Sequence, residues 1–236
     1  MNLIPDVLQR CYINLINPLI SFFIRHKANP NHLTTLGLII QFISMYFLAT
    51  GSFFIGGVLI LAAGTCDMID GKIARSRSVS TKFGALYDST LDRYAEFAMF
   101  FGIGFYLINR QYYVSSIVAF IALGGSLMTS YIRARSEAMG LDCRVGIMQR
   151  PERIVYIGFA SIFSIFFKDM PYPLVIVIAI TAVTSNFTAI QRMVHIYRLT
   201  NSGRELLIQA GQQSTPRNDE TKGSTNESHT LEVKNS

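Results

Sequence analysis

Long apolar segments restrict this chain to a membrane fold more strictly than any other feature of its sequence. Apolar runs of about 20 residues, the length that an α-helix needs to cross the hydrocarbon layer, recur from about residue 33 to about residue 200. Half of the 236 residues are apolar and only 15% are charged, which is far from the balance of a soluble domain. The sequence therefore predicts an all-α integral membrane protein.

The apolar runs divide into six predicted transmembrane helices, near residues 33–51, 53–75, 84–108, 112–134, 150–168 and 172–198. Before them, residues 4–27 alternate apolar and polar groups at helical spacing, which is typical of an amphipathic helix in the membrane interface. From about residue 201 the composition is too polar to support a core. We expect an N-terminal interfacial helix and turn at 1–32, a six-helix membrane domain at 33–200 and a disordered tail at 201–236.

Basic residues gather at alternate ends of the predicted spans, while the opposite connections are short and carry little charge. By the positive-inside rule, the basic ends and both termini face the cytoplasm. The net charge is +6, and the basic residues lie beside apolar spans. Anionic lipid head groups are therefore the expected partner, and nucleic acid is not. The three cysteines, Cys11, Cys66 and Cys143, lack paired metal-ligand spacing, which argues against a disulfide framework or a zinc site.

Four aspartates, Asp67, Asp70, Asp88 and Asp92, lie within or at the ends of two predicted spans. A carboxylate inside a span costs about 3 kcal/mol on insertion scales, so four of them require compensating cations. Asp67 and Asp70 are three residues apart and Asp88 and Asp92 are four apart, so each pair projects from one helix face. A short basic loop at 76–83 returns the chain. We therefore expect the four carboxylates to converge near the cytoplasmic surface.

Oxygen ligands without His or Cys select hard divalent cations such as Mg²⁺ or Mn²⁺, and four carboxylates could bridge two ions. Two ions about 4 Å apart are suited to phosphoryl transfer. Structural ion pairs are the alternative, but one arginine such as Arg75 cannot neutralise four carboxylates. Glu96 continues the Asp88–Asp92 face, either as a supporting partner or in a buried ion pair. A cation transporter or channel is an alternative of another class, although transport favours carboxylates spread along a path.

At these residues the sequence resembles the CDP-alcohol phosphatidyltransferase family, whose signature is D-x-x-D-G-x-x-A-R, eight residues, then G-x-x-x-D-x-x-x-D. Every fixed position is present, as Asp67, Asp70, Gly71, Ala74, Arg75, Gly84, Asp88 and Asp92. The resemblance, over about residues 5–200, implies transfer of a phosphatidyl group from CDP-diacylglycerol or a related CDP-lipid to an alcohol, with CMP as leaving group. It also implies a homodimer.

The same resemblance implies roles for individual residues. The four aspartates would hold two metal ions, and Asp92 would act as general base on the acceptor hydroxyl, either in addition to binding metal or instead of it. A CDP-lipid pocket would be formed by Pro30, Thr34, Gly71, Ala74, Arg75 and Gly84. Small residues such as these also favour close helix packing, which is the alternative interpretation of Gly71, Ala74 and Gly84.

A second group of basic residues flanks the cytoplasmic ends of three predicted helices: Arg133, Arg135, Arg150, Arg153 and Arg192. Guanidinium groups match phosphate bidentately, which predicts a phosphorylated polyol acceptor, although each arginine could simply anchor its helix. The SYxxAR and RPER segments resemble the phosphatidylinositol-phosphate synthase branch, whose acceptor is inositol phosphate. The alternative within the family is phosphatidylglycerophosphate synthase, which uses glycerol 3-phosphate.

Overall fold

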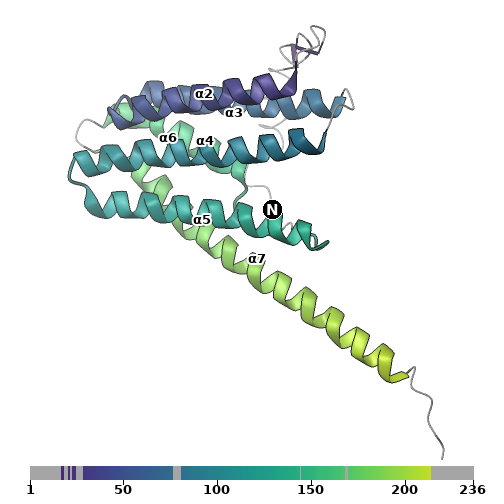
Figure 1. Ribbon diagram of the computed structural model, residues 1–236. Coiled ribbons are helices and arrows are strands. Elements are labelled where there is room, and N and C mark those ends of the chain that lie inside the picture. Colours follow the sequence, from purple (N-terminus) through teal and green to yellow (C-terminus); the bar gives the residue numbers. More distant parts are fainter. Residues whose placement is uncertain are drawn as a thin grey trace, which may run out of the picture. The chain divides into compact units, whose positions relative to one another are not determined.

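Helices account for all regular secondary structure in the part of the chain that the computed structural model describes, namely residues 17–18, 21, 23–24, 29–76, 81–143, 145–167 and 170–213. The elements after residue 29 are α2 (Pro30–Ala49), α3 (Phe53–Ser76), α4 (Lys82–Asn109), α5 (Tyr113–Ala138), α6 (Arg150–Phe163), the 3-10 helix η1 (Ser164–Phe166) and α7 (Tyr172–Gln213), shown in Figure 1. Each of the six predicted segments therefore contains a helix.

Four described segments are long and apolar enough to cross a membrane: Pro30–Ala49, Phe53–Ile73, Tyr113–Ala138 and Tyr172–Asn201. Helix α4 does not meet the same criterion because Asp88, Asp92, Arg93 and Glu96 lie in its N-terminal and central turns. Helix α6 has 14 residues, fewer than the roughly 20 that a perpendicular span needs. The fold is that of a multi-pass membrane protein, and crossing by α4 and α6 stays a prediction.

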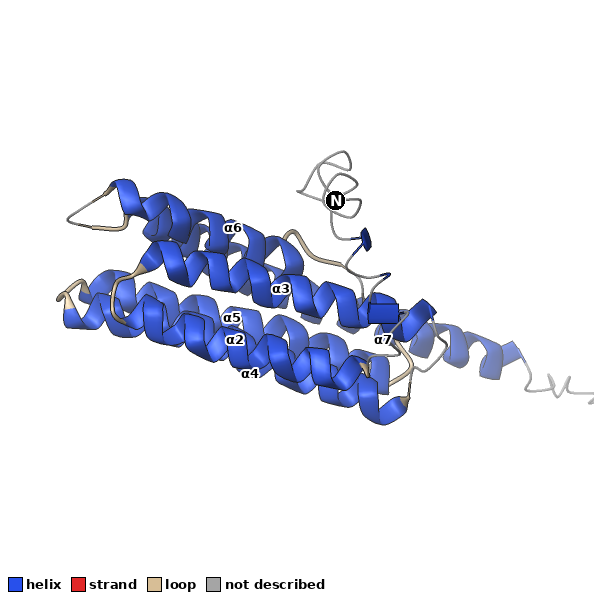
Figure 2. Ribbon diagram, turned by 90° about the horizontal axis from the view of Figure 1, so that it is seen from above, coloured by secondary structure: helices blue, strands red, loops and turns tan. Residues whose placement is uncertain are grey.

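Helix α2 packs against both α3 and α4, while α3 also contacts α6 and α4 contacts α5 (Figure 2). Two of these contacts bring backbones together at glycine. A Cβ on Gly102 of α4 would lie 2.6 Å from the carbonyl oxygen of Met45, and one on Gly57 of α3 would lie 2.6 Å from that of Gly158. Without a side chain at these positions, the helices approach more closely than larger residues would permit.

The bundle interior combines apolar packing with hydroxyl groups that join neighbouring helices. Leu48, Phe100 and Ile103 are fully buried. The Ser44 hydroxyl of α2 donates to the Gly56 carbonyl of α3 over 2.8 Å, and Ser116 of α5 donates to Gly104 of α4 over 3.0 Å. Each hydroxyl thereby satisfies its own donor inside an apolar core.

Three helices begin with clear capping signals. The side chain of Asn29 accepts from the Asn31 amide at the start of α2, and Thr81 accepts from Gly84 at the start of α4. Helix α6 starts with a capping box in which the Gln149 amide donates to Glu152 over 2.8 Å. These caps fix the first turns of α2, α4 and α6, which carry several of the predicted functional residues.

The helix boundaries differ most from the expected ones at the C-terminal end of α7. Helix α7 continues to Gln213, past the expected start of the polar tail at 201, through a segment rich in strong helix formers. Residues 214–236 and most of the predicted interfacial helix at 4–27 lie outside the described residues. Contacts divide the chain into two compact units, Met1–Tyr197 and Arg198–Ser236, and the functional candidates all belong to the first.

Candidate metal and substrate site

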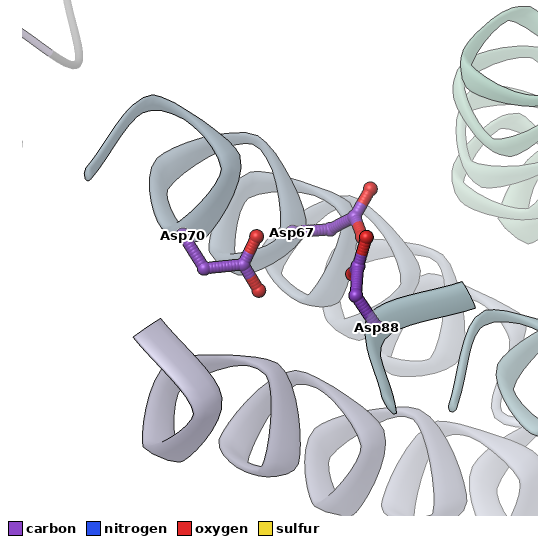
Figure 3. Close-up of side chains that lie close together, drawn as sticks. All are labelled: Asp67, Asp70 and Asp88. Atoms are coloured by element: carbon purple, nitrogen blue, oxygen red, sulfur yellow. The ribbon is translucent and has the colours of Figure 1, made fainter. Parts of the chain in front are cut away.

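Three of the four predicted carboxylates converge where α3 ends and α4 begins. One oxygen from each of Asp67, Asp70 and Asp88 lies within 4.8 Å of the others, and Figure 3 shows the three side chains turned toward one another. Asp70 is only 4% exposed, while Asp67 and Asp88 are half-buried. This donor set contains carboxylate oxygens without imidazole or thiolate, so it is chemically suited to Mg²⁺ or Mn²⁺.

The first turns of α2 hold Asp67, Asp70 and Asp88, the acidic group, in place. The Thr34 hydroxyl donates to Asp70 Oδ2 over 2.7 Å, and the hydroxyls of Thr35 and Tyr87 are 2.9 Å apart. These contacts join α2 to the last turns of α3 and to the second turn of α4. Thr34, which the family resemblance assigns to the nucleotide pocket, is thus also a direct partner of a predicted metal ligand.

Asp92, the fourth predicted ligand, lies beside Asp67 and is paired with an arginine. Arg150 Nη1 lies 2.6 Å from Asp92 Oδ2 and 3.3 Å from Asp67 Oδ2. One guanidinium therefore bridges two of the aspartates from the first residue of α6. The sequence places Arg150 among the predicted acceptor ligands. Helix spacing does not reveal its contact with Asp67, because the two residues are 83 positions apart.

A second charged layer lies one turn deeper along α4. Glu96 accepts hydrogen bonds from Arg153 Nη2 over 2.6 Å and from Ser126 Oγ over 2.7 Å. Arg150 Nε is 3.9 Å from the same Glu96 carboxylate. Glu96 and Arg153 are 3% and 2% exposed, respectively, so this is a buried ion pair that also contacts the arginine next to Asp92.

The predicted nucleotide-binding residues occupy the same helix ends. Pro30 begins α2, and Gly84 lies in the first turn of α4 beside the side chains of Thr81 and Asn31. The Arg75 guanidinium lies over Gly71, at 3.6 Å from where a Cβ would be. Ala74 is helical, but its side chain is outside the described part of the structure.

The remaining predicted acceptor residues differ in exposure. Arg133 and Arg135 are exposed, and Arg133 pairs with Glu137 over 2.9 Å. Arg192 is buried, and it donates to the carbonyls of Thr129 over 2.5 Å and Val145 over 2.9 Å. Arg192 thereby ties α7 to α5 and to the loop before α6, a structural contact that its position in the sequence does not reveal.

A cavity of about 30 Å³ adjoins the acidic group and extends inward between α2, α3, α4 and α6. Its lining includes Gln41, a polar residue in the apolar run of α2 that no sequence motif marks. The full lining is Thr34, Gly37, Leu38, Gln41, Ala63, Gly64, Asp67, Leu91, Asp92, Ala95, Arg150 and Ile154.

Comparisons of the sequence with a family profile and with individual known proteins agree on one family. The sequence profile of CDP-alcohol phosphatidyltransferases matches residues 27–185. The phosphatidylinositol phosphate synthase of Mycobacteroides abscessus is 34% identical over 214 residues, covering 89% of this chain and 96% of that protein. The archaetidylinositol phosphate synthase of Methanothermobacter thermautotrophicus is 32% identical over 199 residues, covering 82% and 98%.

The fold is also similar to crystal structures of the Mycobacterium tuberculosis phosphatidylinositol phosphate synthase. The structure of that protein with CDP-DAG bound is 31% identical, with a TM-score of 0.68, and the match covers 75% of this chain and 90% of that one. Its complex with manganese and citrate gives the same identity and TM-score, with 76% and 88% covered.

Proposed function

The chain belongs to the CDP-alcohol phosphatidyltransferase family, and we propose that it transfers a phosphatidyl group from CDP-diacylglycerol to a hydroxyl of inositol phosphate, releasing CMP. The observation that carries this proposal is the convergence of Asp67, Asp70 and Asp88 at residues of the family signature. The donor is supported by the similar M. tuberculosis structure with CDP-DAG, and the acceptor by the relatives named phosphatidylinositol phosphate synthase. Carboxylates gathered at one end of a bundle favour an enzyme over a transport path.

Mg²⁺ or Mn²⁺ would be held by Asp67, Asp70 and Asp88, with Asp92 completing a site for two ions. The oxygen-only donor set and the manganese complex of the M. tuberculosis protein support this assignment. When bound, the ions would neutralise the charge of the diphosphate and of the transferred phosphoryl group.

The reaction proceeds by attack of the acceptor oxygen on the β-phosphorus. The bond from that phosphorus to the bridging oxygen breaks, and CMP leaves with the bridging oxygen. Asp92 accepts the proton of the attacking hydroxyl. Arg150, 2.6 Å from Asp92 Oδ2, orients the carboxylate for this step.

The substrates would bind on either side of this centre. The CDP moiety would lie against Pro30, Thr34, Gly71, Ala74, Arg75 and Gly84, at the adjoining ends of α2, α3 and α4. The acceptor phosphate would be bound by guanidinium groups of the second basic set, Arg133, Arg135, Arg150, Arg153 and Arg192. The ion pair of Arg153 with Glu96 and the backbone contacts of Arg192 would hold these two groups in fixed positions.

We also propose that all six helices α2–α7 cross the membrane, with both termini and the active site on the cytoplasmic side, and that the protein is a homodimer. The charged residues of α4 are compatible with its crossing, because Glu96 is paired with Arg153 inside the bundle and Asp92 is paired with Arg150. Helix α6 and η1 together extend the segment that can cross.

The decisive experiment measures CMP release by the purified protein in detergent with CDP-diacylglycerol and Mg²⁺ or Mn²⁺. Inositol phosphate, glycerol 3-phosphate, free inositol and serine are compared as acceptors. Turnover with inositol phosphate alone supports the whole proposal. Turnover only with glycerol 3-phosphate would instead establish phosphatidylglycerophosphate synthesis, and full activity of the Asp92→Asn variant would refute the assigned base.

A further inference from the structure

Gln41 is a buried amide without an evident structural role. It lies on α2 and is 4% exposed, and its Nε2 has no hydrogen-bond partner among the described residues. An amide donor that is buried without a partner costs free energy, so such a group in a native protein requires an explanation. A ligand that brings its own acceptor is one explanation.

Gln41 lines the cavity that adjoins the acidic group. At the outer end of this cavity, α3, α4 and α6 contribute Asp67, Asp92 and Arg150. One turn deeper, the same three helices contribute small or apolar residues, namely Ala63, Gly64, Ala95 and Ile154. The cavity is therefore charged at its outer end. Its inner part is lined by apolar residues except for the amide of Gln41.

This order of polarity matches one part of a CDP-lipid. The ester groups of diacylglycerol lie a few bonds inward from the diphosphate, between the charged head and the acyl chains. Gln41 follows Thr34, the partner of Asp70, by seven residues, or about two turns of α2. A volume of about 30 Å³ accommodates a group the size of a water molecule, such as a single carbonyl, and not an acyl chain.

We propose that Gln41 Nε2 donates a hydrogen bond to an ester carbonyl of the CDP-lipid, so that Gln41 selects diester over diether substrates. The proposal rests on the proposed function, because it names a feature of the donor lipid. A diether lipid has no carbonyl oxygen at this place, and its binding leaves the amide unpaired. Sites built to hydrogen-bond a substrate group disfavour analogues that lack it.

The test compares kcat/KM for CDP-diacylglycerol and for a diether CDP-lipid of the same chain length, in mixed micelles of fixed composition. The wild-type protein is expected to prefer the diester about tenfold, the range of one hydrogen bond. Gln41→Met keeps an unbranched side chain of similar length and removes the donor. It is expected to bring the ratio close to one by lowering the diester value, with the diether value unchanged.

Thermal unfolding of the same proteins separates this role from a structural one. Gln41→Met is expected to unfold at the same temperature as the wild type or higher, since it removes an unpaired buried amide. Ser44→Ala is the matched control on α2, because it breaks the hydrogen bond to Gly56 and should lower stability without changing the lipid ratio.

Three outcomes would overturn the proposal: a wild-type protein that uses both lipids equally, a Gln41→Met variant that keeps the diester preference, or one that unfolds at a clearly lower temperature. The first two would mean that the amide binds something other than the ester, such as a water molecule. The third would mean that its partner belongs to the protein. Absence of CMP release from either lipid would instead refute the proposed function.

Discussion

The acidic group at the ends of α3 and α4 differs from Glu96, although both are carboxylates of one helix bundle. Glu96 is balanced inside the protein, by a guanidinium at 2.6 Å and a hydroxyl at 2.7 Å. Asp67, Asp70 and Asp88 are within 4.8 Å of one another, and Arg150 contacts this group at 3.3 Å from Asp67. Arg150, which is shared with Asp92, and Arg93, whose charge acts on Asp88, are two cations for four aspartates and do not balance them. A structural carboxylate is thus distinguished by its internal cation, and a functional one by the need for an external cation.

The largest effect expected from this difference is on activity when one carboxylate of the acidic group is removed. Asp67→Asn should lower kcat by roughly 10³-fold, because several kcal/mol of charge stabilisation by the metal are lost. Its metal-free form should unfold at the wild-type temperature or above, since the substitution relieves repulsion among the aspartates. CMP release and thermal unfolding measure the two effects. A variant that is inactive only because it is unfolded would contradict the comparison.

The opposite pattern is expected at Glu96. Glu96→Gln leaves Arg153 as a buried charge without its carboxylate, and should lower the free energy of unfolding by about 3–5 kcal/mol. Asp88→Asn is the matched control, because Asp88 lies on α4 eight residues before Glu96. This substitution should not destabilise the metal-free protein. Thermal unfolding in detergent compares the two. Equal losses of stability would show that the two regions are not distinct.

The acidic group could be predicted from sequence because its geometry is local. Spacings of three and four residues place each aspartate pair on one helix face, and a short loop brings the two helix ends together. The positions of the helices followed in the same way from the lengths of the apolar runs. These features need no knowledge of how distant segments pack.

The contacts of Arg150, Arg192 and Gln41 could not be predicted because each depends on distant segments. Arg150 meets Asp67 across 83 residues, and Arg192 meets Thr129 across 63. Their positions at helix ends are equally compatible with membrane anchoring or with phosphate binding. Gln41 looks like an isolated polar residue in an apolar run, and only the packing of four helices reveals that it lines a cavity beside the aspartates.

The smallest of the three effects is the stabilisation of the substrate-free protein by metal. At a Mn²⁺ concentration of 100 times its Kd, binding to the folded state alone adds about 2.7 kcal/mol to the free energy of unfolding, and the unfolding temperature rises. Asp67→Asn should lose this rise, whereas Arg133→Gln, which alters an exposed pair with Glu137, should keep it. An equal rise in Asp67→Asn would place the bound cation elsewhere, and the acidic group would then have to be balanced, like Glu96, from within the protein.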